Sequence, residues 1–189
     1  SWSTNGLINE YCNEADAIYE GKPIKVMPLE GAEKLVIEGE SFEAFNTSGG
    51  CATMCETYAD KVENLTYKTI RYPGHLNHMK FLFNDLHLKK NKDILEKLFD
   101  KEVPRTKNDL IIFFVKVIGL IDGVLQEKTY LRKIYGDEKF SAIQLTTASG
   151  ACSALKMFLD GKISSKGFIK QESLSWKDFV DNKFGSVYK

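Results

Sequence analysis

The stretch DLIIFFVKVIGLIDGVLQEKTYLRKIY, residues 109–135, decides the fold class, because it reads as one long β-hairpin. Asp109–Leu120 is rich in β-branched and aromatic residues, Ile121-Asp122-Gly123 supplies a turn, and Val124–Tyr135 returns. In the returning segment, Leu125, Glu127, Thr129 and Leu131 point to one face and alternate with Gln126, Lys128, Tyr130 and Arg132 on the other. This mixture predicts a strand with one face in contact with solvent.

Two shorter hairpins precede this one. Asp16–Met27 turns at Glu20-Gly21-Lys22, and Lys34–Phe45 turns at Glu38-Gly39-Glu40, where glycine provides the positive φ that such turns need. We expect further strands at Val62–Arg71 and Gly167–Ile169. Apolar spacing and capping residues predict helices over residues 4–12, 51–59, 76–86, 93–99, 141–159 and 175–182.

These elements predict an α+β fold: a mixed, largely antiparallel sheet built from hairpins, with helices packed mainly on one face. A parallel nucleotide-binding sheet would alternate strand and helix instead. No Gly-x-Gly-x-x-Gly follows an expected strand, so we expect no Rossmann domain in this chain. The length of 189 residues suits one domain or one and a half. We expect a single α/β domain over residues 1–189, with a helical excursion at about 74–103.

Composition narrows the function classes. The 26 basic and 26 acidic residues balance, which argues against a nucleic-acid or anionic-membrane surface. Apolar runs are too short to span a bilayer, and the opening resembles no signal peptide. The four cysteines form no Cys-x-x-Cys pair, and we expect reduced thiols in a cytoplasmic protein and no metal site. Because the chain begins Ser-Trp-Ser, we expect a processed protein or a piece of a longer one.

The first candidate site is Arg71-Tyr72-Pro73-Gly74-His75, between an expected strand and an expected helix. A guanidinium grips a carboxylate with two parallel hydrogen bonds, and a helix N-terminus favours anions, so this corner is a candidate anion site. A structural turn with a surface arginine is the alternative. His75 suits a general acid or base, a substrate contact or a purely structural position.

Two further segments carry hydrogen-bonding groups beside backbone turns. Asn46-Thr47-Ser48-Gly49-Gly50 ends a strand and opens a helix, a setting that binds phosphate or carboxylate, although a capping turn is the alternative. Trp2-Ser3 offers an aromatic platform and a hydroxyl at the first turn of a helix; an ordinary helix cap beside a core tryptophan is the other interpretation.

Four segments in this order resemble one family: Ser1–Leu7, Ala44–Gly50, Lys68–His75 and Thr146–Gly150. They are similar to the C-terminal, substrate-side region of saccharopine dehydrogenases of the reductase-like type, to which bacterial lysine 6-dehydrogenases are close. The resemblance covers nearly the whole chain. It implies an NAD(P)-dependent oxidoreductase of lysine metabolism, which oxidises a C–N bond by hydride transfer, after which the imine hydrolyses.

In that family an N-terminal Rossmann domain holds NAD or NADP, and a second domain binds the amino-acid substrate and forms the homodimer contact. The resemblance implies that this chain is the second domain, so we expect it alone to be inactive. It also implies substrate-binding roles for Trp2, Ser3, Asn46, Thr47, Ser48, Arg71, Tyr72 and His75, with Thr146 and Thr147 approaching the cofactor. The acid–base catalyst stays unassigned.

One departure keeps other functions open. Fungal saccharopine reductases place an arginine in the loop that reads Asn46-Thr47-Ser48 here, and a glutamine and an aromatic residue where this chain has Pro73 and His75. Fewer cations suit a smaller or less acidic substrate. The alternatives are therefore an ammonia-releasing L-lysine 6-dehydrogenase and a stand-alone binding or oligomerisation module.

Overall fold

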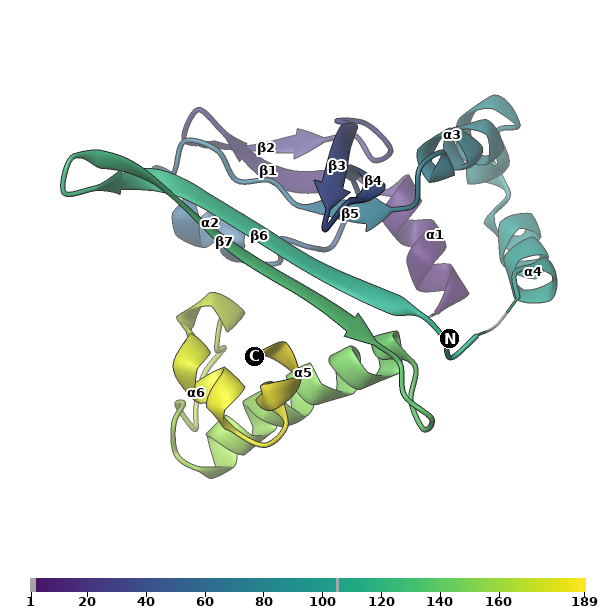
Figure 1. The fold of residues 1–189 in the computed structure, drawn as a ribbon. Helices are drawn as coiled ribbons and strands as arrows, with labels where there is room; N and C mark the ends of the chain where they lie inside the picture. The colour runs from purple at the N-terminus through teal and green to yellow at the C-terminus, as the bar shows by residue number, and fades with distance from the viewer. Residues whose placement is uncertain (1–2, 105) are drawn as a thin grey trace. The chain divides into compact units, whose positions relative to one another are not determined.

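The computed structural model describes residues 3–104 and 106–189, which form two compact units (Figure 1). The N-terminal unit, residues 3–104, is drawn in purple to teal; the C-terminal unit, residues 106–189, runs to yellow. Trp2 lies outside the described residues. A single domain over residues 1–189 stays a prediction. None of the helices in the described parts of the chain has the length and apolar character needed to cross a membrane.

The N-terminal unit mixes short helices with short strands. Its elements are α1 (Thr4–Cys12), β1 (Ala15–Tyr19), β2 (Lys22–Val26), β3 (Glu33–Ile37), β4 (Glu40–Asn46), α2 (Met54–Tyr58), β5 (Lys68–Arg71), α3 (His75–Lys80), the π-helix η1 (Phe81–Asp85), the 3₁₀-helix η2 (Leu88–Lys90) and α4 (Lys92–Glu102). The C-terminal unit contains β6 (Leu110–Ile121), β7 (Val124–Tyr135), α5 (Ala142–Leu159), η3 (Gln171–Ser173), α6 (Trp176–Asp181) and η4 (Gly185–Tyr188).

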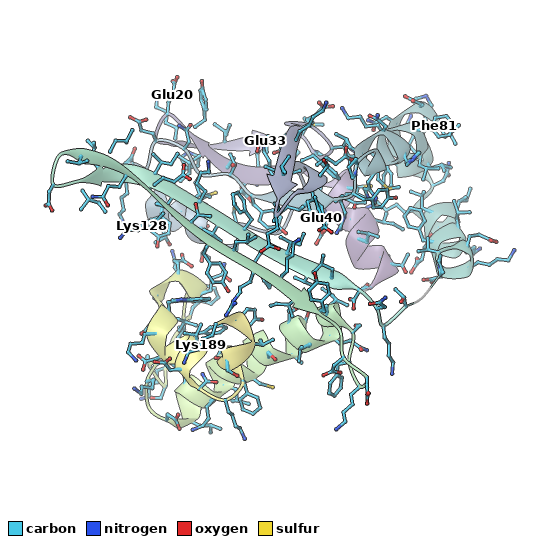
Figure 2. The ribbon with its side chains drawn as sticks, viewed as in Figure 1. Glu20, Glu33, Glu40, Phe81, Lys128 and Lys189 are labelled. Carbon is cyan, nitrogen blue, oxygen red and sulfur yellow. The ribbon has the colours of Figure 1, made fainter. Side chains whose placement is uncertain are left out.

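All three predicted hairpins are present, and each closes with a two-residue turn. The turn residues are Glu20-Gly21, Glu38-Gly39 and Asp122-Gly123, and both members of every pair have positive φ. That conformation is the type I′ turn, whose twist matches that of the flanking strands. Figure 2 labels Glu20 in the first turn and Lys128 on β7, both of them exposed.

The predicted α+β class is confirmed, with antiparallel pairing in every sheet of the described residues. The expectation of one sheet is wrong, because the strands of the described residues form three sheets: β1-β2, β3-β4-β5 and β6-β7. The predicted strand Val62–Arg71 explains part of the difference. Leu65 exchanges two backbone hydrogen bonds with Ile18 of β1, whereas Lys68–Arg71 pairs with β4. The segment therefore changes partner half-way and does not continue one ladder.

Helix starts follow local backbone signals. The Ser3 side chain accepts a hydrogen bond from the Gly6 N–H and caps α1. The helix expected from residue 51 begins only at Met54, since Ala52 has φ 45° and cannot belong to a right-handed helix. Ser141 begins α5 with a capping box, in which Gln144 returns a hydrogen bond to the Ser141 backbone.

The core of the N-terminal unit joins its helices to β4. Phe45, at the end of β4, is fully buried together with residues from α1, η1 and α4. The members are Ile8, Tyr11, Leu29, Phe45, Leu76, Met79, Phe83 and Leu95. Helix α1 therefore places both an aliphatic residue and a tyrosine against the end of β4, next to which the predicted site loop begins.

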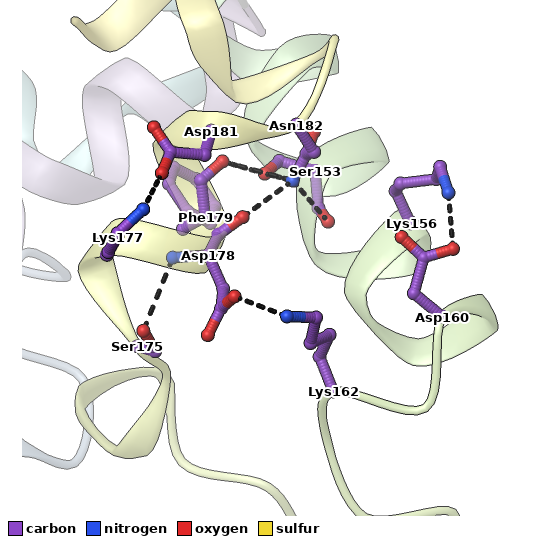
Figure 3. A network of polar contacts seen from close by, with 10 residues as sticks. All are labelled: Ser153, Lys156, Asp160, Lys162, Ser175, Lys177, Asp178, Phe179, Asp181 and Asn182. Atoms are coloured by element: carbon purple, nitrogen blue, oxygen red, sulfur yellow. Dashed lines mark hydrogen bonds and ion pairs between the residues drawn. The ribbon is translucent and has the colours of Figure 1, made fainter.

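The C-terminal unit is held by polar contacts between α5 and α6 (Figure 3). The Asn182 side chain donates to Ser153 Oγ at 2.7 Å and to the Phe179 carbonyl at 3.0 Å, and Ser153 Oγ donates to the same carbonyl at 2.6 Å. The strand expected at Gly167–Ile169 is absent from the described segment; no neighbouring strand pairs with it, and Phe168 is 82% exposed.

Candidate functional site

The corner between β5 and α3 carries Arg71 and His75. Gly74 makes the turn with φ 93°, a left-handed conformation that glycine tolerates best. The Glu43 carboxylate accepts hydrogen bonds from the backbone N–H groups of Gly74 at 3.0 Å and Leu76 at 2.5 Å. We expected these helix N–H groups to face an external anion. Instead the chain's own carboxylate engages them, and Arg71 remains as the cationic part of the corner.

Arg71 is oriented by one neighbour. Its Nε donates a hydrogen bond to the hydroxyl oxygen of Tyr11 at 3.1 Å. Within residues 3–104 and 106–189, Arg71 takes part in no ion pair, and no hydrogen bond engages its two Nη atoms. A half-buried guanidinium held at Nε retains the paired N–H groups that bind a planar carboxylate.

His75 lies in an aromatic setting beside this arginine. Its ring stacks on Phe45, with centroids 6.1 Å apart and planes 15° apart, and meets the edge of Tyr72 at 4.9 Å. Burial, and then the Arg71 charge, lower the pKa of His75 to about 4. The imidazole is therefore neutral near pH 7, so it adds no positive charge to the corner.

The predicted loop at 46–50 begins at Asn46, the last residue of β4. Asn46 and Thr47 are buried, and the Ser48 N–H bonds to the Glu10 carbonyl at 3.2 Å. The Asn46 backbone pairs with Leu29 and Glu30, so this residue fixes the course of the chain. Buried Thr47 Oγ1 has no hydrogen-bond partner among the described residues, which is unusual for a hydroxyl.

Thr47 lines a small cavity of about 90 Å³. Its walls come from the start of β1, the loop between β4 and α2, and one aromatic ring: Ala15, Asp16, Thr47, Gly49, Gly50, Cys51, Ala52 and Tyr67. This volume suits a small polar group. The unpartnered threonine hydroxyl and the glycine-lined wall make the cavity a second candidate binding feature of this unit.

Two further ionisable side chains belong to the electrostatic surroundings of Arg71. Burial raises the pKa of Glu10, and the Arg71 charge opposes that rise. Burial also raises the pKa of Tyr67; a hydrogen bond with Thr69 opposes that rise, the Glu10 charge adds to it and the Arg71 charge opposes it. A carboxylate and a guanidinium near each other, but not ion-paired, would complement the two charges of an amino acid.

The structure brings together part of the predicted site. Arg71, Tyr72 and His75 form one cluster, in which Tyr72 is exposed. The Ser3 hydroxyl is engaged in capping α1, and the prediction for Trp2 lies outside the described residues. Thr146 and Thr147 lie on α5 of the C-terminal unit.

Those two threonines differ in their surroundings. The Thr146 hydroxyl donates to the Ala142 carbonyl at 2.8 Å, within its own helix, whereas Thr147 is exposed. Their predicted approach to a cofactor stays a prediction.

Sequence reasoning missed Glu10, Tyr11 and Glu43. All three influence the Arg71 corner although they lie far from it in the sequence: Tyr11 is 60 residues from Arg71, and Glu43 is 31 residues from Gly74. One signal for Tyr11 was available. It follows Leu7 and Ile8 at helical spacing, so a buried phenol in need of a hydrogen-bond partner was predictable, although its partner was not.

Comparisons with known proteins agree with this architecture. The family model described as "Saccharopine dehydrogenase C-terminal domain" matches residues 1–184. The chain is also similar to the solved apo structure of histidine-tagged saccharopine dehydrogenase (L-Glu forming) from Saccharomyces cerevisiae, with a TM-score of 0.68 and 15% sequence identity. That match covers 89% of this chain and 55% of the yeast chain, so the chain spans about half of that protein's length.

Proposed function

Because the chain belongs to the saccharopine dehydrogenase C-terminal domain family, we propose that it forms the substrate-binding and dimerisation domain of an NAD(P)-dependent oxidoreductase of lysine metabolism. The proposed reaction is that of a saccharopine dehydrogenase. A hydride leaves the carbon that bears the amine, and water hydrolyses the resulting imine to an amine and a carbonyl compound. An N-terminal Rossmann domain outside this sequence would bind NAD or NADP and supply the hydride acceptor.

The observation that carries this proposal is the state of Arg71. Its Nε is held by Tyr11, and its Nη atoms have no protein partner in the described parts of the chain. An arginine that is held at Nε and has both Nη groups available can bind a carboxylate of an amino-acid substrate. Asn46, Thr47 and Ser48 lie where the end of β4 pairs with the start of β5, and Tyr72 and His75 follow Arg71 at the end of β5. We propose that these residues complete the site together with Trp2 and Ser3.

Free lysine is the second candidate substrate. Arg71 is the one arginine in residues 3–104, and neutral His75 contributes no second cation. A site with a single guanidinium favours a substrate with one carboxylate, whereas saccharopine has three. Glu10 would attract the substrate ammonium in this alternative. The protein would then be an L-lysine 6-dehydrogenase that releases ammonia.

Assays of the full-length protein separate these candidates. We expect reduction of NAD or NADP with saccharopine and none with lysine. Reduction with lysine and release of ammonia would assign the lysine 6-dehydrogenase reaction. If neither substrate reduces either nucleotide and neither binds, the remaining candidate is a stand-alone binding or oligomerisation module. We expect the 189-residue chain alone to be inactive.

We also propose that the protein is a cytoplasmic homodimer whose contact includes the β6–β7 hairpin. Apolar side chains of this hairpin are exposed in the single chain: Val117, Ile118, Leu120, Val124 and Leu125 are each more than half exposed. The outer edges of both strands are unpaired among the described residues. A second copy covering them would bury apolar surface and protect a strand edge.

A further inference from the structure

The hydroxyl group of Tyr11 lies between Arg71 and His75. Tyr11 is 1% exposed, and its oxygen is 3.1 Å from Arg71 Nε and 2.9 Å from His75 Nε2. Arginine has only donors, so the phenol oxygen accepts from Arg71. The phenol proton is then free to bond to His75 Nε2, and the single hydroxyl group links both side chains.

This arrangement assigns the imidazole proton. If Nε2 accepts from Tyr11, the neutral ring carries its proton on Nδ1. In the opposite tautomer, Nε2–H would also donate to the phenol oxygen, and the buried phenol proton would lose its partner. Nδ1 has no partner among the described residues in either case. The Nδ1–H tautomer therefore leaves fewer buried polar groups unsatisfied.

The surroundings of His75 favour the neutral ring. Phe45 stacks on one face, and the rings of Tyr11 and Tyr72 meet it edge-on. The charged and titratable groups that act on it are Arg71 and His78, which disfavour the imidazolium, and Glu43, which favours it. Glu43 already accepts hydrogen bonds from two backbone N–H groups at the start of α3, so its negative charge does not cause the imidazole to become protonated.

We propose that Tyr11 is a positioning residue that fixes the Arg71 guanidinium by accepting from Nε and fixes the His75 tautomer by donating to Nε2. The second consequence rests on the proposed function: with its Nε end held, Arg71 presents its two Nη groups to the substrate carboxylate. Tyr11 itself touches no substrate. Its effect reaches the ligand through the arginine.

Tyr11→Phe in the full-length protein tests this role. Phenylalanine keeps the ring, which packs against Phe45 and Phe83, and removes only the hydroxyl. Tyr130→Phe is the matched control, because it also removes a hydrogen-bonded phenol hydroxyl: that of Tyr130 donates to the Tyr188 backbone carbonyl within the C-terminal unit.

The first measurement needs no substrate. Two-bond ¹H–¹⁵N correlation spectra of the labelled full-length protein report the tautomer of each histidine, and His75→Gln assigns the His75 signals. We expect the Nδ1–H tautomer at pH 7 in the wild type and in Tyr130→Phe, and a mixture of tautomers in Tyr11→Phe. An Nε2–H ring in the wild type, or an unchanged single tautomer in Tyr11→Phe, would overturn the inference.

The second measurement concerns the arginine. With saccharopine and with lysine as probes, we expect Tyr11→Phe to raise KM about tenfold and to leave kcat nearly unchanged, since one hydrogen bond to a charged group is lost. If Tyr11→Phe changes the His75 tautomer but leaves KM unchanged, Tyr11 does not position Arg71 for substrate binding. If neither probe reacts with the wild type, the proposed function fails, whereas the spectra still decide the role of Tyr11 toward His75.

Discussion

The ring of Tyr67 lies directly against Gly50, and a Cβ at Gly50 would sit 2.1 Å from Cγ of that ring. Both residues line the cavity that contains the unpartnered Thr47 hydroxyl. The close approach requires glycine, because any side chain would displace the ring. Because Gly50 has no side chain, the Tyr67 ring can form one wall of this cavity.

Gly50→Ala should destabilise the fold by about 1–3 kcal/mol, the usual cost of overpacking a closely packed position. Urea unfolding of the purified protein measures this cost. Gly119→Ala is the control, since a Cβ there meets no atom within 4 Å. If the ring is the obstacle, Tyr67→Ala should reduce the cost of Gly50→Ala. Equal costs in both backgrounds would show that the clash does not matter.

Glu43→Gln should lower the free energy of unfolding by about 1–2 kcal/mol, because an amide accepts at only one of its two ends whereas the carboxylate accepts from both Gly74 and Leu76. Because α3 carries His75 at its start, we also expect a higher KM for substrate. Glu63→Gln, at an exposed position, is the control. Equal unfolding midpoints for Glu43→Gln and the control would contradict this account.

His75 should make stability depend on pH in the acidic range. Its pKa is lowered to about 4 in the folded state from 6.5, so between these values the unfolded chain binds more protons. Stability should therefore fall as pH drops from about 6.5 to 4, and this contribution should be constant above about 6.5. The expected loss is about 1–2 kcal/mol, since solvent screens the partly exposed ring.

Unfolding free energies at pH 7 and pH 4.5 test this dependence. His75→Gln should lose less stability between these two values than the wild type. His87→Asn removes another histidine from a left-handed position that asparagine tolerates, and it should behave like the wild type. A His75→Gln variant with the full wild-type loss would show that the acid sensitivity arises elsewhere.

The proposed dimer contact is testable through Leu120→Lys. Leu120 is 71% exposed near the β6–β7 turn, so a lysine there should not harm the single chain but should oppose burial against a second copy. Light scattering after size-exclusion chromatography should show a dimer for the wild type and more monomer for the variant. A control at Lys128→Arg, on β7, keeps the surface charge. An unchanged dimer in Leu120→Lys would remove the hairpin end from the contact.

Local signals predicted much of this fold. Glu20-Gly21, Glu38-Gly39 and Asp122-Gly123 located all three hairpins, because a type I′ turn depends on only two residues. Such local signals do not predict which other strand each hairpin pairs with. Leu65 pairs with Ile18 and Ile70 pairs with Ala44, and the residues near the strand do not specify either pairing. Three sheets therefore formed where one was expected.

The candidate site shows the same limit. Arg71 was identifiable as a rare arginine beside a turn, but the groups that control it come from other elements. Tyr11 and Glu43 reach the corner only after α1 and β4 have packed on it. Contacts between residues 30 to 60 positions apart depend on tertiary packing, which periodicity and turn chemistry do not specify.

Arg71→Lys separates carboxylate binding by the paired N–H groups from simple charge attraction, because a lysine keeps the charge and loses those groups. In the full-length protein we expect binding of the carboxylate substrate to weaken by about 1–3 kcal/mol, measured by titration calorimetry and as KM. The exposed Arg132→Lys should match the wild type, and circular dichroism should show both variants folded. Unchanged substrate affinity, KM and kcat in Arg71→Lys would contradict the account and place the carboxylate elsewhere.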